Sequence, residues 1–222
     1  MPTVLLLGAT GLVGRHALRA FAADPQWDRV VTLDRRPIAS AGPTHEPHVI
    51  EFDRMDEAAD RFACDTLVCT LGTTMKQAGS EAAFRHVDLE IPFQAAQLAH
   101  AAGATQMLLV SALGADPDSR IFFNRVKGEA EQHVQEVGFE TVQILRPSLL
   151  TGDRDETRLG ERLGEAVLTL ATPLLQGPLK VLRPTPAEDV GRALAVLAAR
   201  RPLGVHIVDP PAIRSWATGG PS

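Results

Sequence analysis

Hydrophobic and polar positions along the chain follow two patterns, short apolar runs and longer amphipathic segments. Apolar runs bounded by glycine, proline or charged residues are typical of buried parallel strands. Such runs predict strands at residues 4–7, 29–34, 48–52, 65–72, 105–114, 141–148 and 204–209. Apolar residues at helical spacing predict helices at residues 11–24, 80–103 and 187–201. The second of these is expected to be interrupted at Pro92 and to end at Gly103.

One more helix is predicted after the segment SALGADPDS, with Asp118 or Ser119 as its N-cap and EAEQHVQEV as its body. The alternation of strands and helices predicts an α/β fold with a doubly wound parallel sheet and helices on both faces. We expect residues 1–222 to form a single domain. Residues 149–186 are irregular, and we expect them to form a small lid on the substrate side. The tail AIRSWATGGPS is expected to be only partly ordered.

The composition fits a soluble globular protein and argues against several functions. With 45% hydrophobic and 22% charged residues, the chain carries enough apolar material for a sizeable core. A formal net charge of −5 argues against nucleic acid or an anionic membrane as a partner. The apolar start MPTVLLLGATGLVG lacks a basic region, so we expect neither a signal peptide nor a membrane span.

The two cysteines, Cys64 and Cys69, are too few for a zinc site of the usual Cys/His type. A disulfide framework is not expected from them either. We therefore expect buried reduced thiols, no metal site and a cytoplasmic location.

A glycine pattern carries the first functional signal. Gly8, Gly11 and Gly14 are spaced G-x-x-G-x-x-G between a predicted strand and a predicted helix, as the dinucleotide fingerprint requires. Gly8 would permit a tight turn, Gly11 would let a pyrophosphate approach the helix N-terminus, and Gly14 would let helix and strand pack closely. A glycine-rich turn without a ligand is the alternative. We expect a Rossmann-like NAD(P)-binding domain. The other expected cofactor-binding members of the turn are Thr10, Leu12 and Val13.

The end of the second predicted strand gives conflicting signals about the cofactor. Asp34 stands where an acid would accept a hydrogen bond from a ribose 2′-hydroxyl, which favours NAD(H). Arg35 and Arg36 follow at once, and guanidinium groups suit the 2′-phosphate of NADP(H). Asp34 could instead pair with one arginine and orient it, and the arginines could belong to a solvated loop.

Longer segments resemble a known family. They are GATGLVG, CTLGTTMKQAGSEAAFRHVD, VSALGADPDSRIFFNRVKGEAE and LRPSLLTGDRDETRLGE, which together span most of the chain. The chain is similar to the extended and atypical branches of the short-chain dehydrogenase/reductase superfamily. It resembles most closely the Tat-interacting-protein oxidoreductase family and its small bacterial relatives. The LGTT…AGSE and SALGAD…NRVKGE segments are far more specific than the glycines.

The resemblance implies further cofactor contacts. Asp53 would lie near the adenine amino group, and NADP(H) is favoured through Arg35. Asp34 departs from the small neutral residue expected in the family, so NAD(H) remains open. Four residues after the fourth strand would line the cofactor, and three after the sixth would bring backbone toward the nicotinamide amide. These are Leu71, Gly72, Thr73 and Thr74, and then Arg146, Pro147 and Ser148.

The resemblance also implies a catalytic set with one member missing. In the superfamily, a serine after the fifth strand meets a Tyr-x-x-x-Lys on the next helix. The phenol gives its proton to the developing alkoxide, the lysine lowers the pKa of the phenol and holds the nicotinamide ribose, and the serine steadies the carbonyl oxygen. Ser111 and Lys127 match, but Phe123 stands at the tyrosine position, and the chain has no tyrosine at all.

No convincing substitute for the phenol is found. Ser111 is a poor acid without help, Asn124 delivers no proton, and His86 is expected to be a structural or surface residue. Bound water could serve if the site is wet. Ser111 could also cap a turn and Lys127 could be solvated. The arginines of GDRDETRLGER could line a site for an anionic substrate or form a solvated helix. They are Arg154, Arg158 and Arg162.

Two functions remain open. The first is an NADP(H)-dependent oxidoreductase for an unknown carbonyl or alcohol, with impaired or unconventional catalysis. The second is a dinucleotide-binding sensor or interaction module that does not turn over. The partners expected are an unknown small-molecule substrate and a second copy of the chain or another protein.

Overall fold

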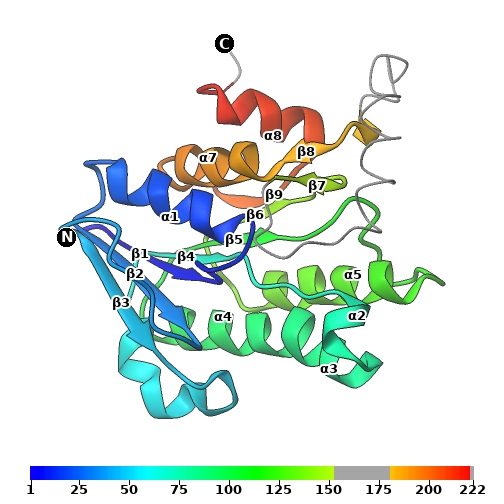
Figure 1. The fold of residues 1–222 in the computed structure, drawn as a ribbon, viewed down its shortest axis with the longest axis horizontal. Coiled ribbons are helices and arrows are strands. Elements are labelled where there is room, and N and C mark those ends of the chain that lie inside the picture. The colour runs from blue at the N-terminus through cyan, green and yellow to red at the C-terminus, as the bar shows by residue number, and fades with distance from the viewer. Residues whose placement is uncertain (153–180, 221–222) are drawn as a thin grey trace.

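The centre of the molecule is a parallel sheet of seven strands in the computed structural model, which describes residues 1–152 and 181–220. Its strands are β1 (Thr3–Leu7), β2 (Arg29–Asp34), β3 (His45–Val49), β4 (Thr66–Cys69), β5 (Gln106–Val110), β6 (Thr141–Leu145) and β9 (Gly204–Val208). Their order is β3-β2-β1-β4-β5-β6-β9 (Figure 1). The strand order reverses between β1 and β4, where open α/β sheets bind ligands at the carboxyl ends. The Rossmann-like, doubly wound fold is confirmed.

The register of β1 brings two predicted site segments to the same level. Leu7 pairs with Leu33 of β2 on one side and with Cys69 of β4 on the other. Gly8, the first residue after β1, therefore lies beside Asp34, the last residue of β2. The parallel pairing thus places the glycine turn beside the acid that the sequence assigns to the ribose.

The third strand differs from its predicted bounds of 48–52. β3 runs from His45 to Val49 and lies at an edge of the sheet, where Pro47 is tolerated because it need not donate to a further strand. Ile50 and Phe52 are buried, but they follow the strand. Phe52 already begins the 3₁₀ element η1 (Phe52–Phe62). Burial without strand pairing produced the apolar run there.

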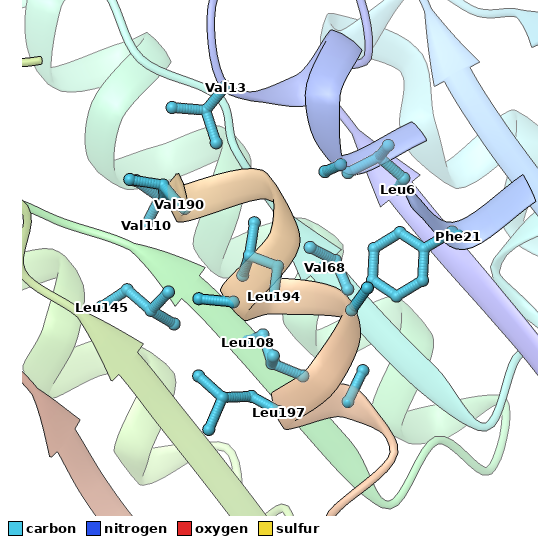
Figure 2. Packing of buried hydrophobic residues seen from close by; sticks show 14 of the residues in the cluster. Leu6, Val13, Phe21, Val68, Leu108, Val110, Leu145, Val190, Leu194 and Leu197 are labelled. Atoms are coloured by element: carbon cyan, nitrogen blue, oxygen red, sulfur yellow. The ribbon is translucent and has the colours of Figure 1, made fainter. Parts of the chain in front are cut away.

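One face of the sheet is covered by α1 (Gly14–Ala23), α7 (Ala187–Ala198) and α8 (Pro210–Ala217), which lie together in Figure 1. Figure 2 shows Leu194 and Leu197 of α7 directed toward Leu108 of the sheet. Gly191 lets α7 approach α1, because a Cβ there would lie 2.6 Å from the Cβ of His16. These contacts bury one side of every central strand.

The expectation of a partly ordered tail is wrong for α8. Asp209 caps this helix by accepting a 2.9 Å hydrogen bond from the Ala212 backbone, and Pro210 stands in the first turn. Ile213 is fully buried in the α1–α7 core. A cap and one buried apolar side chain order a segment whose composition alone is typical of a loose end.

The opposite face is covered by η1, α4 (Ile91–Ala101) and α5 (Phe122–Glu136), with a core of their own around Phe62, Met107 and Val134. Three short elements precede α4. They are α2 (Met75–Ala78), α3 (Glu81–Arg85) and the single π-helical turn η2 (His86–Glu90). Figure 1 shows α4 and α5 side by side below the sheet.

The helix predicted at residues 80–103 is divided directly before Pro92. Ser80 caps α3, and the widened turn η2 separates α3 from α4. Pro92 falls in the first turn of α4, and because it has no N–H to donate to the preceding turn, its position coincides with the widened turn η2. α4 ends before Gly103, whose φ of +103° suits a helix end.

The start of α5 also differs from the prediction. Neither Asp118 nor Ser119 is the N-cap, since α5 begins at Phe122. The Ser119 hydroxyl instead accepts a 3.2 Å hydrogen bond from the Ile121 backbone, and the Asp118 backbone donates to the Asp116 carboxylate at 3.0 Å. These short-range bonds form a turn that delays the helix.

Two remaining expectations concern the lid and the thiols. Most of residues 149–186 lies outside the described residues, and its two ends form the strand pair β7 (Leu150–Thr151) and β8 (Thr185–Pro186). Cys64 and Cys69 are free thiols, as predicted. Burial raises the pKa of Cys64 to about 12 and that of Cys69 to about 11, so both stay protonated near neutral pH.

Candidate functional site

The glycine turn is built around close backbone contacts. A Cβ on Gly14 would lie 1.9 Å from the carbonyl oxygen of Gly8, and Gly8 itself has a φ of +86°. The Gly11 backbone donates to the same carbonyl at 2.9 Å, while Gly11 and Thr10 are exposed. Gly8 and Gly14 therefore shape the turn, and Gly11 with Thr10 presents backbone to the outside.

The two apolar turn residues face the other way. Val13 is buried, and Figure 2 shows it within the cluster that also contains Val190. Leu12 is half-buried against the same cluster. Both anchor the turn to this core, and any contact that the buried Val13 makes with a cofactor falls to its backbone.

Asp34 is buried at the end of β2, with 3% of its surface exposed. Burial raises the pKa of Asp34, while hydrogen bonds from the Thr32 side chain and the Thr10 backbone act in the opposite direction. Its Oδ2 has no partner among the residues that the structure describes. Such an oxygen fits a hydroxyl donor. Arg35 and Arg36, by contrast, are exposed.

Asp53, the residue expected near the adenine, lies exposed on η1. Its Oδ1 is 2.7 Å from Nε2 of His86, and Nδ1 of His86 is 2.9 Å from Oε2 of Glu90. These contacts, that with Glu90 above all, raise the pKa of His86. With both ring nitrogens engaged by carboxylates, His86 links η1 to η2 and makes a poor substitute for the missing phenol.

The loop after β4 meets Lys127 at a residue that the sequence did not single out. Asp88, from η2, has a fully buried side chain whose Oδ1 lies 2.7 Å from Nζ of Lys127. Its Oδ2 accepts a 2.8 Å hydrogen bond from the Thr73 backbone. Gly72 lies beside both charged groups. One signal was available: Asp88 lies four residues after Phe84, so a helix over this segment places the acid on the same face as that apolar side chain.

The neighbouring loop residues have separate tasks. Leu71 packs against the second core, and the Thr74 hydroxyl caps α2 by accepting a 3.3 Å hydrogen bond from the Gln77 backbone. The loop is thus fixed at both ends, with Gly72 exposed between them.

Phe123 lies in the first turn of α5, one turn before Lys127, and is 37% exposed. Its ring centroid is 5.8 Å from that of Phe84, and the ring of Phe122 packs on Phe84 at 5.6 Å. Ser111 follows β5 directly and is buried, with no hydrogen-bond partner for its Oγ in the described ranges. The aromatic ring is therefore placed by packing, and the serine hydroxyl is unused.

The residues after β6 are more occupied than expected. The Arg146 guanidinium binds the buried carboxylate of Glu131 on α5, with Nε 3.0 Å from Oε1, and this contact raises the pKa of Arg146. The Pro147 carbonyl accepts a 2.8 Å hydrogen bond from the Leu113 backbone. The Ser148 hydroxyl lies 2.9 Å from that of Thr185. Any role of this segment toward a nicotinamide thus falls to backbone groups. Arg154, Arg158 and Arg162 lie outside the described residues.

The profile of the NAD dependent epimerase/dehydratase family matches residues 4–201. This chain belongs to that family. Protein HTATIP2 of Rattus norvegicus is 34% identical over 165 residues, 72% of this chain and 68% of the rat protein. The protein named fmp52, mitochondrial, of Emericella nidulans is 35% identical over 168 residues, 72% of each chain. That of Candida albicans is 31% identical over 215 residues, 93% and 92% of the two chains.

Several solved structures have the same fold as this protein. MoeE5 in complex with UDP-glucose and NAD aligns over 95% of this chain and 79% of its own, with a TM-score of 0.69 and 17% identity. UDP-glucuronic acid 4-epimerase from Bacillus cereus in complex with NAD aligns over 93% and 77%, with a TM-score of 0.67 and 13% identity.

These comparisons confirm one expectation and overturn another. The resemblance to atypical short-chain dehydrogenase/reductases of the Tat-interacting-protein type is confirmed, and with it a dinucleotide-binding protein that uses a nicotinamide cofactor. The expected cytoplasmic location is contradicted, because the fungal relatives are named as mitochondrial proteins.

The described residues fit a nicotinamide dinucleotide. The turn at Gly8 and Gly14 leaves no room for side chains, and the buried oxygens of Asp34 and Ser111 have no partner in the described part of the protein. Within those same ranges, no group of three or more His, Cys, Asp or Glu side chains could hold a metal ion.

No helix in the described part of the chain is both long and apolar enough to cross a membrane.

Proposed function

We propose that this protein is an oxidoreductase-type member of its family, acting on an unknown carbonyl or alcohol, in which proton transfer is impaired. One observation carries the proposal. Lys127 and Ser111 are kept in buried positions, whereas Phe123 on the same helix as Lys127 presents a ring without a hydroxyl. The glycine turn and Lys127 support cofactor binding, and the proposed acid of the reaction is missing.

The chemistry explains why one absent oxygen matters. A bound nicotinamide supplies or accepts a hydride, and the substrate oxygen must gain or lose a proton at the same time. Lys127 would hold the nicotinamide ribose. The Oγ of Ser111, which has no partner in the described part of the chain, would steady the substrate oxygen. Phe123 has no atom that titrates. General acid–base help contributes about 10²–10⁴ in rate, which corresponds to roughly 3–5 kcal/mol of barrier.

NADP(H) is proposed as the favoured cofactor, through the exposed guanidinium groups of Arg35 and Arg36. The Oδ2 of Asp34, without a partner among the residues described, supports NAD(H) as the second candidate, since a ribose hydroxyl could donate a hydrogen bond to it. Matched titrations of NADPH and NADH separate the two. A preference for NADPH that disappears in Arg35→Ala supports the arginine, and a preference for NADH in the wild type overturns it.

A second candidate function follows from the same missing acid. A protein that binds a dinucleotide without consuming it could act as a sensor or interaction module, through a surface that changes with occupancy. A second copy of the chain or another protein is the partner that this candidate requires.

Binding and turnover by the wild-type protein distinguish the two functions. NADPH and NADH are titrated by calorimetry, and cofactor oxidation is then followed by absorbance with a panel of aldehydes and ketones. Slow but measurable oxidation that depends on the carbonyl compound supports the oxidoreductase. Tight binding with no oxidation supports the sensor. Absence of binding to either dinucleotide contradicts both.

A further inference from the structure

A buried ion pair joins two elements at the nicotinamide side of the site. Nζ of Lys127 on α5 lies 2.7 Å from Oδ1 of Asp88 on η2. The Asp88 side chain is fully buried, and the Lys127 side chain is only 10% exposed. Both charges are therefore largely removed from water. Because such desolvation can exceed the Coulombic gain, a buried pair is weak evidence for stability and invites another explanation.

The same carboxylate also fixes the loop after β4. Oδ2 of Asp88 accepts a 2.8 Å hydrogen bond from the Thr73 backbone. A Cβ on Gly72 would lie 3.4 Å from Asp88 and 3.7 Å from Lys127, so this exposed glycine lies directly beside the pair. The Asp88 side chain thus fixes the position of Lys127 relative to the loop after β4.

The backbone is locally altered where Asp88 lies. η2 is a single π-helical turn between two α-helical segments, and such turns are frequent at functional sites. Phe84 before it and Leu89 within it are buried in one apolar cluster with Val126 of α5. The widened turn therefore carries a carboxylate into a region that is otherwise packed with apolar side chains.

We propose that Asp88 is a positioning residue that holds Lys127 and the Thr73 segment in place for the nicotinamide ribose. The ion pair with Asp88 places Nζ of Lys127, and an ammonium group has three N–H donors with which it can reach the ribose hydroxyls. Asp88 touches neither cofactor nor substrate and acts through Lys127. The proposal rests on the proposed function, since it requires a dinucleotide to be bound with its nicotinamide half at Lys127.

A comparison of a whole and a partial ligand tests this role. ADP contains the adenosine and pyrophosphate but lacks the nicotinamide ribose, so its affinity should not depend on Lys127. NADPH, NADH and ADP are titrated by calorimetry into the wild type, Asp88→Asn and Glu129→Gln. The last is the control, because Glu129 pairs with Arg85 across α3 and α5 at 2.6 Å without contacting Lys127.

Asp88→Asn is expected to weaken dinucleotide binding by on the order of tenfold while ADP binding stays at the wild-type value. Glu129→Gln is expected to change neither. Unchanged dinucleotide affinity in folded Asp88→Asn overturns the proposal, and so does an equal loss of dinucleotide and ADP affinity, because that indicates general disruption. If the wild type binds ADP and no dinucleotide, the proposed function fails instead.

A double variant keeps the test valid if Asp88→Asn does not fold. Lys127→Met removes the cation, and Lys127→Met with Asp88→Asn replaces the pair by two neutral groups, which buried sites tolerate better than one lone charge. Asn keeps a side-chain oxygen that can accept the hydrogen bond of the Thr73 backbone. If the charge of Asp88 acts through Lys127, the double variant therefore binds NADPH and NADH no more weakly than Lys127→Met alone. A further loss of about tenfold in the double variant overturns the proposal.

Discussion

The proposed adenosine side and the proposed nicotinamide side of the site each contain a buried aspartate, and the two aspartates differ in their partners. Asp34 at the end of β2 has a pKa raised by burial, and its Oδ2 has no partner among the described residues. Asp88 on η2, by contrast, forms an ion pair with Lys127 and accepts a hydrogen bond from the Thr73 backbone. Because Lys127 neutralises Asp88 within the protein, we assign Asp88 a structural role. The partnerless oxygen of Asp34 is instead able to accept a hydrogen bond from a ligand.

The difference indicates that the two sides of the site are prepared for a ligand in different ways. On the adenosine side, strand register and glycine contacts prepare backbone and one acid for the ligand. On the nicotinamide side, a helical turn, a lysine and a loop are locked together before any ligand arrives. The comparison assumes that both aspartates serve one bound dinucleotide, and the following changes test that assumption.

The largest effect is expected from Gly14→Ala. Its Cβ would be placed 1.9 Å from the Gly8 carbonyl, so the turn must move. The free energy of unfolding should fall by about 1–3 kcal/mol or more, and ADP and dinucleotide affinity should be lost together. Urea denaturation and calorimetry measure the two effects.

Gly11→Ala is the matched control for that change. A Cβ on Gly11 would lie 3.2 Å from the same carbonyl, which needs only a small adjustment. Its stability should stay within about 1 kcal/mol of the wild type, while ligand affinity falls because the exposed backbone is no longer open. Equal stability losses in the two variants would contradict this account of the turn.

A smaller effect is expected from pH at Asp34. The pKa of Asp34 is raised in the folded protein. The free energy of unfolding should therefore decrease as the pH rises from the ordinary pKa of an aspartate to the raised pKa, because the unfolded chain ionises first. A ribose hydroxyl binds the ionised form better, so NADH affinity should rise over the same range, by about five- to tenfold. The measurement is NADH titration between about pH 4 and pH 7. Asp34→Asn should remove this dependence, and an unaltered pH profile in that variant would rule out Asp34 as its source.

The smallest effect is expected at His86, which links the two sides through η1 and η2. Its folded-state pKa is raised, so its contribution to stability is complete below its ordinary pKa and is lost as the pH rises through the raised value. Urea midpoints at about pH 5.5 and about pH 8.5 measure this. The wild type should lose slightly more stability over that interval than His86→Asn, and a difference of the opposite sign would contradict the assignment.

The adenosine side was easier to predict from sequence than the nicotinamide side, for physical reasons. Gly8, Gly11 and Gly14 act through local backbone geometry, which a short pattern records directly. Asp88 acts through a π turn that brings it to Lys127, a residue 39 positions later in the chain, and no local pattern records such a contact.

The errors in the fold have the same origin. Pro47 in an edge strand, buried Ile50 beyond its end, and Ile213 in the last helix all depend on tertiary neighbours. The seven strands and the main helices were predictable because burial of one or both faces imposes a period on the sequence. The bounds and caps of these elements were less predictable. A local turn such as that at Ser119 uses the same residue types as a helix N-cap and delays the start of the helix.

The most direct test of the central claim is the reaction rate of Phe123→Tyr. Phe122→Tyr is the matched control, because both rings pack on Phe84 and only position 123 corresponds to the missing phenol. We expect Phe123→Tyr to bind NADPH and NADH as the wild type does and to reduce at least one carbonyl compound at least about tenfold faster. Phe122→Tyr should gain nothing. A wild type that already turns over as fast as Phe123→Tyr would contradict the claim that the site lacks only its acid.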